Sequence, residues 1–130
     1  MAQVKLAYFS YPFSDNPDRR TDEAVNIAFQ ICRIYNDLFP VVPHLTFNSL
    51  WPKGKEVDVA RNLKILQAEL EMIKRCDLFI VGMDRLSEMS TGMFWELAYA
   101  LLLGKEILQV VFDPAGEDDE VMALKEPKIL

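Results

Sequence analysis

The chain has 130 residues, of which 51% are hydrophobic, so it falls within the size range of one domain and has ample material for a core. It carries 14 Lys and Arg against 20 Asp and Glu, a formal net charge of −6 that would repel a phosphate backbone, and no basic run offsets it. We therefore expect one domain over residues 1–130, with neither nucleic acid nor an anionic membrane as partner.

The N-terminus and the two cysteines bear on the expected compartment. From Met1 the sequence passes almost directly into an apolar strand pattern, with no charged leader, signal region or small-residue cleavage site. No apolar run is long enough to span a membrane. Cys32 and Cys76 form no CxxC, no zinc-ligand spacing and no obvious disulfide framework. We expect a cytosolic protein in which both cysteines are buried or half-buried thiols.

The beginning of the chain predicts a strand, a long loop and a helix. Residues 4–9 form an apolar strand pattern, and the two prolines and the Asp-Asn pair of residues 10–17 exclude a regular element after it. From about Arg20 to Tyr35 apolar residues recur at helical spacing in one broad stripe. This spacing predicts an amphipathic helix.

The middle of the chain predicts a strand and a second helix. Residues 41–47 have a strand pattern, residues 48–56 form a loop, and Asp58 is a plausible N-cap. The helix that follows ends near Arg75. Its apolar stripe steps by four and three residues in turn and consists of Val59, Leu63, Leu66, Leu70 and Ile73.

The remaining patterns complete an alternation of strand and helix. Residues 78–82 are a continuous apolar run, typical of a central parallel strand buried on both faces. A third helix over residues 92–103 is apolar on almost every face and is closed by Gly104, and residues 106–112 predict a further strand. The alternation predicts an α/β fold: a three-layer sandwich with a parallel sheet of four or five strands, in a flavodoxin-like or Rossmann-like order.

The loop after the first strand is one candidate site, because open parallel sheets bind ligands outside the carboxyl ends of their strands. It carries Ser10, Arg19 and Arg20 just before a helix N-terminus, where backbone N–H groups and a guanidinium could hold an anion such as phosphate. A proline-rich loop with solvated arginines would have the same composition. The sequence leaves both interpretations open.

Glu96 is the second candidate. It is the only charged residue between Glu88 and Lys105, and its helical neighbours are apolar. An acid in such a setting is rarely buried without a reason. Its place in the first turns of a helix, or a distant basic partner, would give it a structural role. A carboxylate at the mouth of an apolar pocket would instead be a nucleophile or base.

Several other kinds of site find no support in the sequence. No GxGxxG or GxxxxGK[ST] follows a strand, so dinucleotide and P-loop chemistry are not indicated. The single histidine, His44, falls in a predicted strand as a packed or rim residue, which leaves no Ser-His or Cys-His nucleophile pair. No carboxylate cluster suggests a metal. We expect neither a metal nor a cofactor.

Three segments carry a resemblance to a known family. They are Ala-Tyr8-Phe-Ser-Tyr-Pro-Phe13, Cys-Asp77-Leu-Phe-Ile-Val-Gly82, and Ser90-Thr-Gly92-Met-Phe-Trp-Glu96-Leu-Ala-Tyr-Ala100 with Gly104-Lys105. Together they resemble the nucleoside 2-deoxyribosyltransferase-like superfamily from Val4 to Phe112. The most specific part is the Gly-x-x-x-Glu-Leu-x-x-Ala helix start.

The resemblance implies a flavodoxin-like fold and a set of roles. Glu96 would attack the anomeric carbon of a 2-deoxyribosyl group, Tyr8 would orient this carboxylate, and Asp77 would lie near the sugar or the leaving base. A carboxylate suits this chemistry because it can trap an oxocarbenium-like centre as a covalent glycosyl-enzyme. The residues expected to bind substrate are Ser10, Pro12, Phe13, Arg19, Arg20, Gly82, Ser90 and Gly92.

Departures from the family pattern bear on the substrate. Ser90 stands where the transferases have a sugar-binding acid, and it resembles the phosphate-binding serine of deoxynucleoside 5′-monophosphate N-hydrolases. Phe94 replaces a usual glycine. We expect cleavage or transfer of the N-glycosidic bond of a nucleoside or its 5′-monophosphate, in a homo-oligomer. The alternatives are a non-catalytic nucleotide-binding module and, more weakly, a phosphoacceptor domain, whose acidic positions hold Ser10-Tyr11 and Gly82-Met83 here.

Overall fold

The computed structural model describes residues 3–12, 17–50, 59–84, 89–114, 122–124 and 128–129. The first four strands alternate with helices, as expected, except that two helices and not one lie between the second and third strands. The strands are β1 (Lys5–Ser10), β2 (Leu38–Val41), β3 (Leu78–Asp84), β4 (Glu106–Pro114), β5 (Met122–Leu124) and β6 (Lys128–Ile129); the helices are α1 (Pro17–Ile34), α2 (Pro43–Leu50), α3 (Val59–Arg75) and α4 (Thr91–Leu102). Within these ranges no helix has the length and apolar character to cross a membrane.

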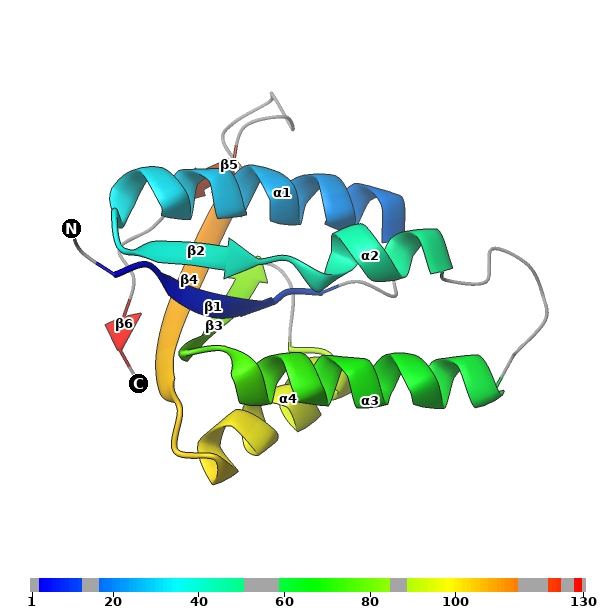
Figure 1. Cartoon of the computed structure of the whole chain (residues 1–130). Coiled ribbons are helices and arrows are strands. Elements are labelled where there is room, and N and C mark those ends of the chain that lie inside the picture. Colours follow the sequence, from blue (N-terminus) through cyan, green and yellow to red (C-terminus); the bar gives the residue numbers. More distant parts are fainter. Residues whose placement is uncertain are drawn as a thin grey trace.

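One sheet organises the chain. Its strands follow the order β2-β1-β3-β4-β5, and β6 also pairs with β4. The first four are parallel, whereas β5 and β6 run antiparallel to β4. Helices α1 and α2 cover one face and α3 and α4 cover the other (Figure 1). This is the predicted α/β sandwich with four parallel strands, extended by two short antiparallel strands from the tail.

The alternation of side chains along β1 sets up the two halves of the core. Ala7 and Phe9 face α1, whereas Tyr8 faces α3 and α4. The Tyr8 ring stacks on Phe79 of β3, with ring centroids 5.6 Å apart. All three β1 side chains are fully buried. The strand period of two therefore places one phenol inside the layer formed by the last two helices.

The predicted second strand is wrong in position. Residues 41–47 were expected to form it, but β2 ends at Val41 and α2 begins at Pro43. Pro43 lacks a backbone N–H and has a fixed φ, which suits the first turn of a helix and not a strand interior. Pro40 fits in β2 because this strand lies at the edge of the sheet. The proposed N-cap Asp58 lies outside the described residues.

The core-facing side of α3 also differs from the prediction. Of the expected stripe, Ile73 is buried, but Val59, Leu63 and Leu66 are 63%, 55% and 43% exposed. The buried face instead includes Ile65, which lies two helical turns before Ile73. The spacing predicted the helix correctly but placed the wrong side of it against the core.

Gly82 belongs to the packed core. A Cβ atom at this position would lie 2.5 Å from Cε1 of Phe9, on the neighbouring strand. We expect Gly82→Ala to lower the free energy of unfolding by about 1–3 kcal/mol, because the Phe9 ring has to shift within a packed interior. Gly92→Ala is the control: only Ser90 Oγ, 4.0 Å away, approaches a Cβ there. Urea denaturation measures both, and equal effects would contradict the packing role of Gly82.

Candidate active site

Glu96 lies on α4 and points at the carboxyl end of β1. Glu96 is 9% exposed, and its carboxylate accepts two hydrogen bonds from β1. Tyr8 Oη donates to Oε2, and Ser10 Oγ donates to Oε1 at 3.1 Å. Tyr8 and Ser10 are two residues apart on a strand and so face the same side of the sheet. Both oxygens of one carboxylate are thus held by hydroxyl donors from a single strand.

The surroundings of Glu96 change its ionisation. Burial raises the pKa of Glu96 from the ordinary value of 4.5 to about 7, against the opposing effect of the hydrogen bonds from Tyr8 and Ser10. Burial and the nearby Glu96 charge raise the pKa of Tyr8 well above 10, so the phenol stays protonated and remains a donor. At neutral pH the Glu96 carboxyl is present in both its protonated and its ionised form, and the neutral hydroxyls of Tyr8 and Ser10 hold it in either case.

Glu69 of α3 is a second carboxyl near Glu96, and the sequence analysis missed it. Burial is the main reason that the pKa of Glu69 rises to about 8, and the charge of Glu96 adds to the shift. A signal for it existed: Glu69 lies four residues from both Ile65 and Ile73, the two buried residues of α3. Positions i, i+4 and i+8 share one helix face, so Glu69 is an acid within the core-facing stripe.

Asp77, which was expected to lie near the sugar or the leaving base, is not part of this cluster. It directly precedes β3 at the amino end of the sheet, where its Oδ2 accepts a hydrogen bond from the backbone N–H of Leu6 at 2.8 Å. Val81, which pairs with Ser10, is about 13 Å farther along the strand, at about 3.3 Å per residue. The carboxyl of Asp77 is exposed and holds β1 and β3 together.

The two arginines expected in the first loop lie in α1, where both form ion pairs with Glu23. Arg20 is 4% exposed; its guanidinium lies 3.3 Å from Glu23 Oε1 and 5.7 Å from the centre of the Tyr11 ring. Arg19 is exposed and lies 3.7 Å from the same carboxylate oxygen. Arg20 thus joins α1 to the end of β1, a packing role that the anion hypothesis did not include.

The remaining residues near this loop also pack. Pro12 is buried, and its carbonyl oxygen lies 3.2 Å from Nε2 of His44. His44 is buried as expected, but in α2 and not in a strand. Burial lowers the pKa of His44, so its ring is neutral at pH 7. Phe13 lies outside the described residues.

Ser90 is the N-cap of α4. Its Oγ accepts a hydrogen bond from the backbone N–H of Met93 at 3.2 Å, and Thr91 and Gly92 form the exposed first turn. The hydroxyl proton of Ser90 is not used by this contact, because a hydroxyl both accepts and donates. Ser90 therefore lies at the start of the helix that carries Glu96, and its hydroxyl can still donate a hydrogen bond to a ligand. Gly82, by contrast, packs against Phe9.

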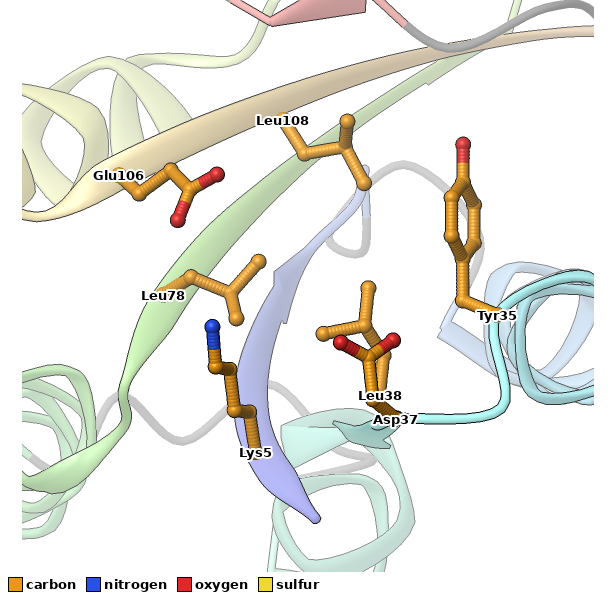
Figure 2. A pocket seen from close by; sticks show the side chains of 7 residues that line it. All are labelled: Lys5, Tyr35, Asp37, Leu38, Leu78, Glu106 and Leu108. Atoms are coloured by element: carbon orange, nitrogen blue, oxygen red, sulfur yellow. The ribbon is translucent and has the colours of Figure 1, made fainter. Parts of the chain in front are cut away.

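A pocket of about 230 Å³ lies at the other end of the sheet. It is lined by Lys5, Tyr35, Asp37, Leu38, Leu78, Glu106 and Leu108, residues at or near the starts of the strands (Figure 2). Parallel sheets bind ligands at their carboxyl ends, where Glu96 lies. This pocket is separate from the Glu96 cluster. Among the described residues no group of three or more His, Cys, Asp or Glu side chains is placed to hold a metal.

The chain is similar in structure to solved enzymes, although no family model matches it and no curated protein matches it in sequence. A 2-desoxiribosyltransferase from Leishmania mexicana has a TM-score of 0.55 and 21% identity over 85% of this chain and 65% of that one. A 2-deoxyribosyltransferase from Bacillus psychrosaccharolyticus has a TM-score of 0.54 and 21% identity over 86% and 74%. The chain thus spans less than two thirds of the Leishmania protein. At these identities the likeness shows a shared flavodoxin-like α/β fold.

Proposed function

We propose that this protein cleaves or transfers the N-glycosidic bond of a deoxynucleoside or its 5′-monophosphate, with Glu96 as the nucleophile. The observation that carries the proposal is the buried carboxylate of Glu96, which is held through both oxygens by Tyr8 and Ser10 with Glu69 close by. Burying an acid in this way is costly unless it serves a purpose. The fold shared with the two deoxyribosyltransferases supports the same chemistry.

The two carboxyls divide the roles of the reaction. An oxygen of Glu96 forms a bond to the anomeric carbon as the bond from that carbon to the base nitrogen breaks, and the electron pair goes to the base. Burial raises the pKa of both carboxyls, and the negative charge of Glu96 raises the pKa of Glu69 further, so Glu69 holds a proton while Glu96 is ionised. It donates this proton to the departing base.

The second half of the reaction removes the sugar from Glu96. Water or another base attacks the anomeric carbon of the glycosyl-enzyme, gives a proton to Glu69 and releases the Glu96 carboxylate. Hydrolase and transferase thus share every residue and differ only in the acceptor. Throughout, Tyr8 and Ser10 keep Glu96 in one orientation.

Incubation with substrates tests the proposal. The protein should release free base from a panel of deoxynucleosides and their 5′-monophosphates, or exchange it for an added second base, and chromatography would detect either product. Glu96→Gln is the control for contaminating activity. Tight binding of a nucleotide without turnover of any panel member would favour the non-catalytic binding module and overturn the enzymatic proposal.

Ser90 provides a test of the 5′-phosphate. We expect Ser90→Asp to weaken monophosphate binding about tenfold or more while a nucleoside still binds, because an acid would lie beside the anion. Asp is a good N-cap, so α4 should keep its start. Ser90→Asn is the matched control, since it caps the helix without adding charge. Calorimetric titration gives both affinities, and equal losses for nucleoside and nucleotide would remove the phosphate from the proposal.

We further propose that the protein acts in the cytosol as a homo-oligomer. The apolar character of α4, which carries no charged residue except the buried Glu96, is the feature that motivates the oligomer. Such a helix is atypical of an element that faces water.

A further inference from the structure

Asn62 of α3 carries a buried hydrogen-bond acceptor with no donor in the described part of the chain. Its Oδ1 is fully enclosed, and none of the described residues donates a hydrogen bond to it. Burying an acceptor without a donor is costly, so the great majority of such atoms in folded proteins are paired. The Asn62 oxygen is therefore open to a donor that the described residues do not supply.

Asn62 lies on the face of α3 that carries Glu69. Over residues 59–68 every side chain except those of Asn62 and Ile65 is exposed. Asn62, Ile65 and Glu69 follow one another at intervals of three and four residues, the spacing that places side chains on one side of a helix. This is the side on which Glu69 approaches the carboxylate of Glu96.

Along this face, Asn62 lies on the outer side of the cluster. Seven residues separate it from Glu69, which corresponds to about 10 Å along the helix. In Figure 1 the first turns of α3 extend beyond the carboxyl ends of β1 and β2. Asn62 is half-buried, so its amide borders space that a ligand can enter. A nucleobase with a hydrogen bond at each end can span the distance between the two side chains.

We propose that Asn62 binds the base of the substrate and selects bases that carry an exocyclic amino group, as adenine and cytosine do; this rests on the proposed reaction at Glu96. The sugar stays at Glu96, because its anomeric carbon has to reach that carboxylate, so only the base extends to Asn62. An oxygen acceptor needs a donor, and the amino groups of adenine and cytosine provide N–H donors at the base edge. Asparagine recognises adenine in DNA by the same pairing.

Bases without this amino group are disfavoured. Hypoxanthine and uracil have a carbonyl oxygen where adenine and cytosine have the amino group, so two acceptors would face each other at Asn62. The amide can turn its Nδ2 toward such a carbonyl, which limits the selectivity. We expect the preference for the amino bases to be about ten- to hundredfold in kcat/KM.

Two matched pairs of substrates test the proposal. Deoxyadenosine is compared with deoxyinosine and deoxycytidine with deoxyuridine, as nucleosides and as 5′-monophosphates. Wild-type protein should favour the amino member of each pair. In Asn62→Leu, which keeps the size but has no polar side-chain atom, the two members should become nearly equal. In Asn62→Asp the preference should increase, because a carboxylate keeps the acceptor and has no donor for a carbonyl.

Asn26→Leu is the matched control. Asn26 is a half-buried asparagine of α1, in the other helical layer, and its Oδ1 accepts a hydrogen bond from Gln30 Nε2 at 3.2 Å. This replacement should leave the preference at its wild-type value. Melting curves check the fold of Asn62→Leu, which should be at least as stable as wild type because it removes a buried unpaired acceptor. A clear loss of stability would identify Asn62 as a structural residue.

Equilibrium binding separates the role of Asn62 from the reaction. Calorimetric titration of Glu96→Gln with the same ligands, alone and combined with Asn62→Leu, measures selectivity without turnover. A wild type without preference, or a preference that survives Asn62→Leu, would overturn the role of Asn62 while the reaction stands. Selective binding that depends on Asn62, with no turnover by wild type, would overturn the reaction and support the base site. Neither binding nor turnover of any ligand would overturn both.

Discussion

Replacing Glu96 with Gln is expected to lower turnover by about 10⁴-fold or more while substrate binding survives. The amide keeps the size and most of the packing of Glu96 but lacks the negative charge that attacks the anomeric carbon. One amide oxygen can still accept from Tyr8 or Ser10, so the local structure should hold. Single-turnover kinetics with calorimetric binding separates the two effects, and near-normal turnover in the variant would contradict the nucleophile.

The same substitution should stabilise the protein at alkaline pH. The folded pKa of Glu96 is about 7, above its ordinary 4.5, so the folded state binds the proton more tightly than the unfolded state does. The free energy of unfolding therefore falls as pH rises from about 4.5 to 7, by on the order of 3 kcal/mol. Gln cannot ionise, so this fall in the free energy of unfolding should be absent from the variant. Melting curves at pH 5 and pH 8 measure it.

Stability also distinguishes catalysis from a structural role of Glu96. If this carboxylate were paired with a buried Lys or Arg, Glu96→Gln would lower the free energy of unfolding by roughly 3 kcal/mol or more. The described hydrogen-bond partners of Glu96 are the hydroxyls of Tyr8 and Ser10, which are neutral donors. We therefore expect the variant to be equal to or more stable than wild type at pH 8, and a large loss there would identify a structural acid.

Glu69→Gln is expected to have the second largest effect. It removes the proton donor for the leaving base, so turnover should fall about 10²–10⁴-fold. With the pKa of Glu69 raised to about 8, wild-type activity should decline above that pH, and the variant should lose this alkaline limb. On a substrate whose base leaves without protonation, Glu69→Gln should lose much less activity.

Glu71→Gln is the matched control on the same helix. Glu71 is exposed and forms an ion pair with Arg75 at 2.9 Å, one turn along the surface of α3. Its replacement should leave both turnover and the alkaline limb unchanged, since exposed pairs of this kind contribute little. Equal kinetic losses in Glu69→Gln and Glu71→Gln would contradict the role of Glu69.

Much of the fold could be predicted because it depends on local patterns. The run at residues 78–82 identified the buried strand β3, and the isolation of Glu96 among apolar neighbours singled out the central residue of the cluster. Both signals arise from burial, because buried segments are recognisable from the pattern of apolar residues in the sequence. The antiparallel strands β5 and β6 gave no such pattern, being three and two residues long.

The partner carboxyl could not be found in the same way. Asp77 precedes the central strand and drew attention through its position, whereas Glu69 lies in a helix whose stripe of leucines suggested a different rotation. Which side of α3 faces the sheet depends on contacts with β1 and α4, and these are not local in sequence. Because α3 runs from the carboxyl edge of the sheet to the amino edge, its end leaves Asp77 away from Glu96.

The covalent intermediate tests the central claim most directly. A 2′-fluoro-substituted deoxynucleoside should glycosylate the protein and then turn over slowly, because fluorine withdraws electrons from the oxocarbenium-like centre. Mass spectrometry of the quenched and digested protein should find one fluorodeoxyribosyl group on the peptide that contains Glu96, and none in Glu96→Gln. Turnover of natural substrate with no adduct, or an adduct on another residue, would contradict the assignment of Glu96 as the nucleophile.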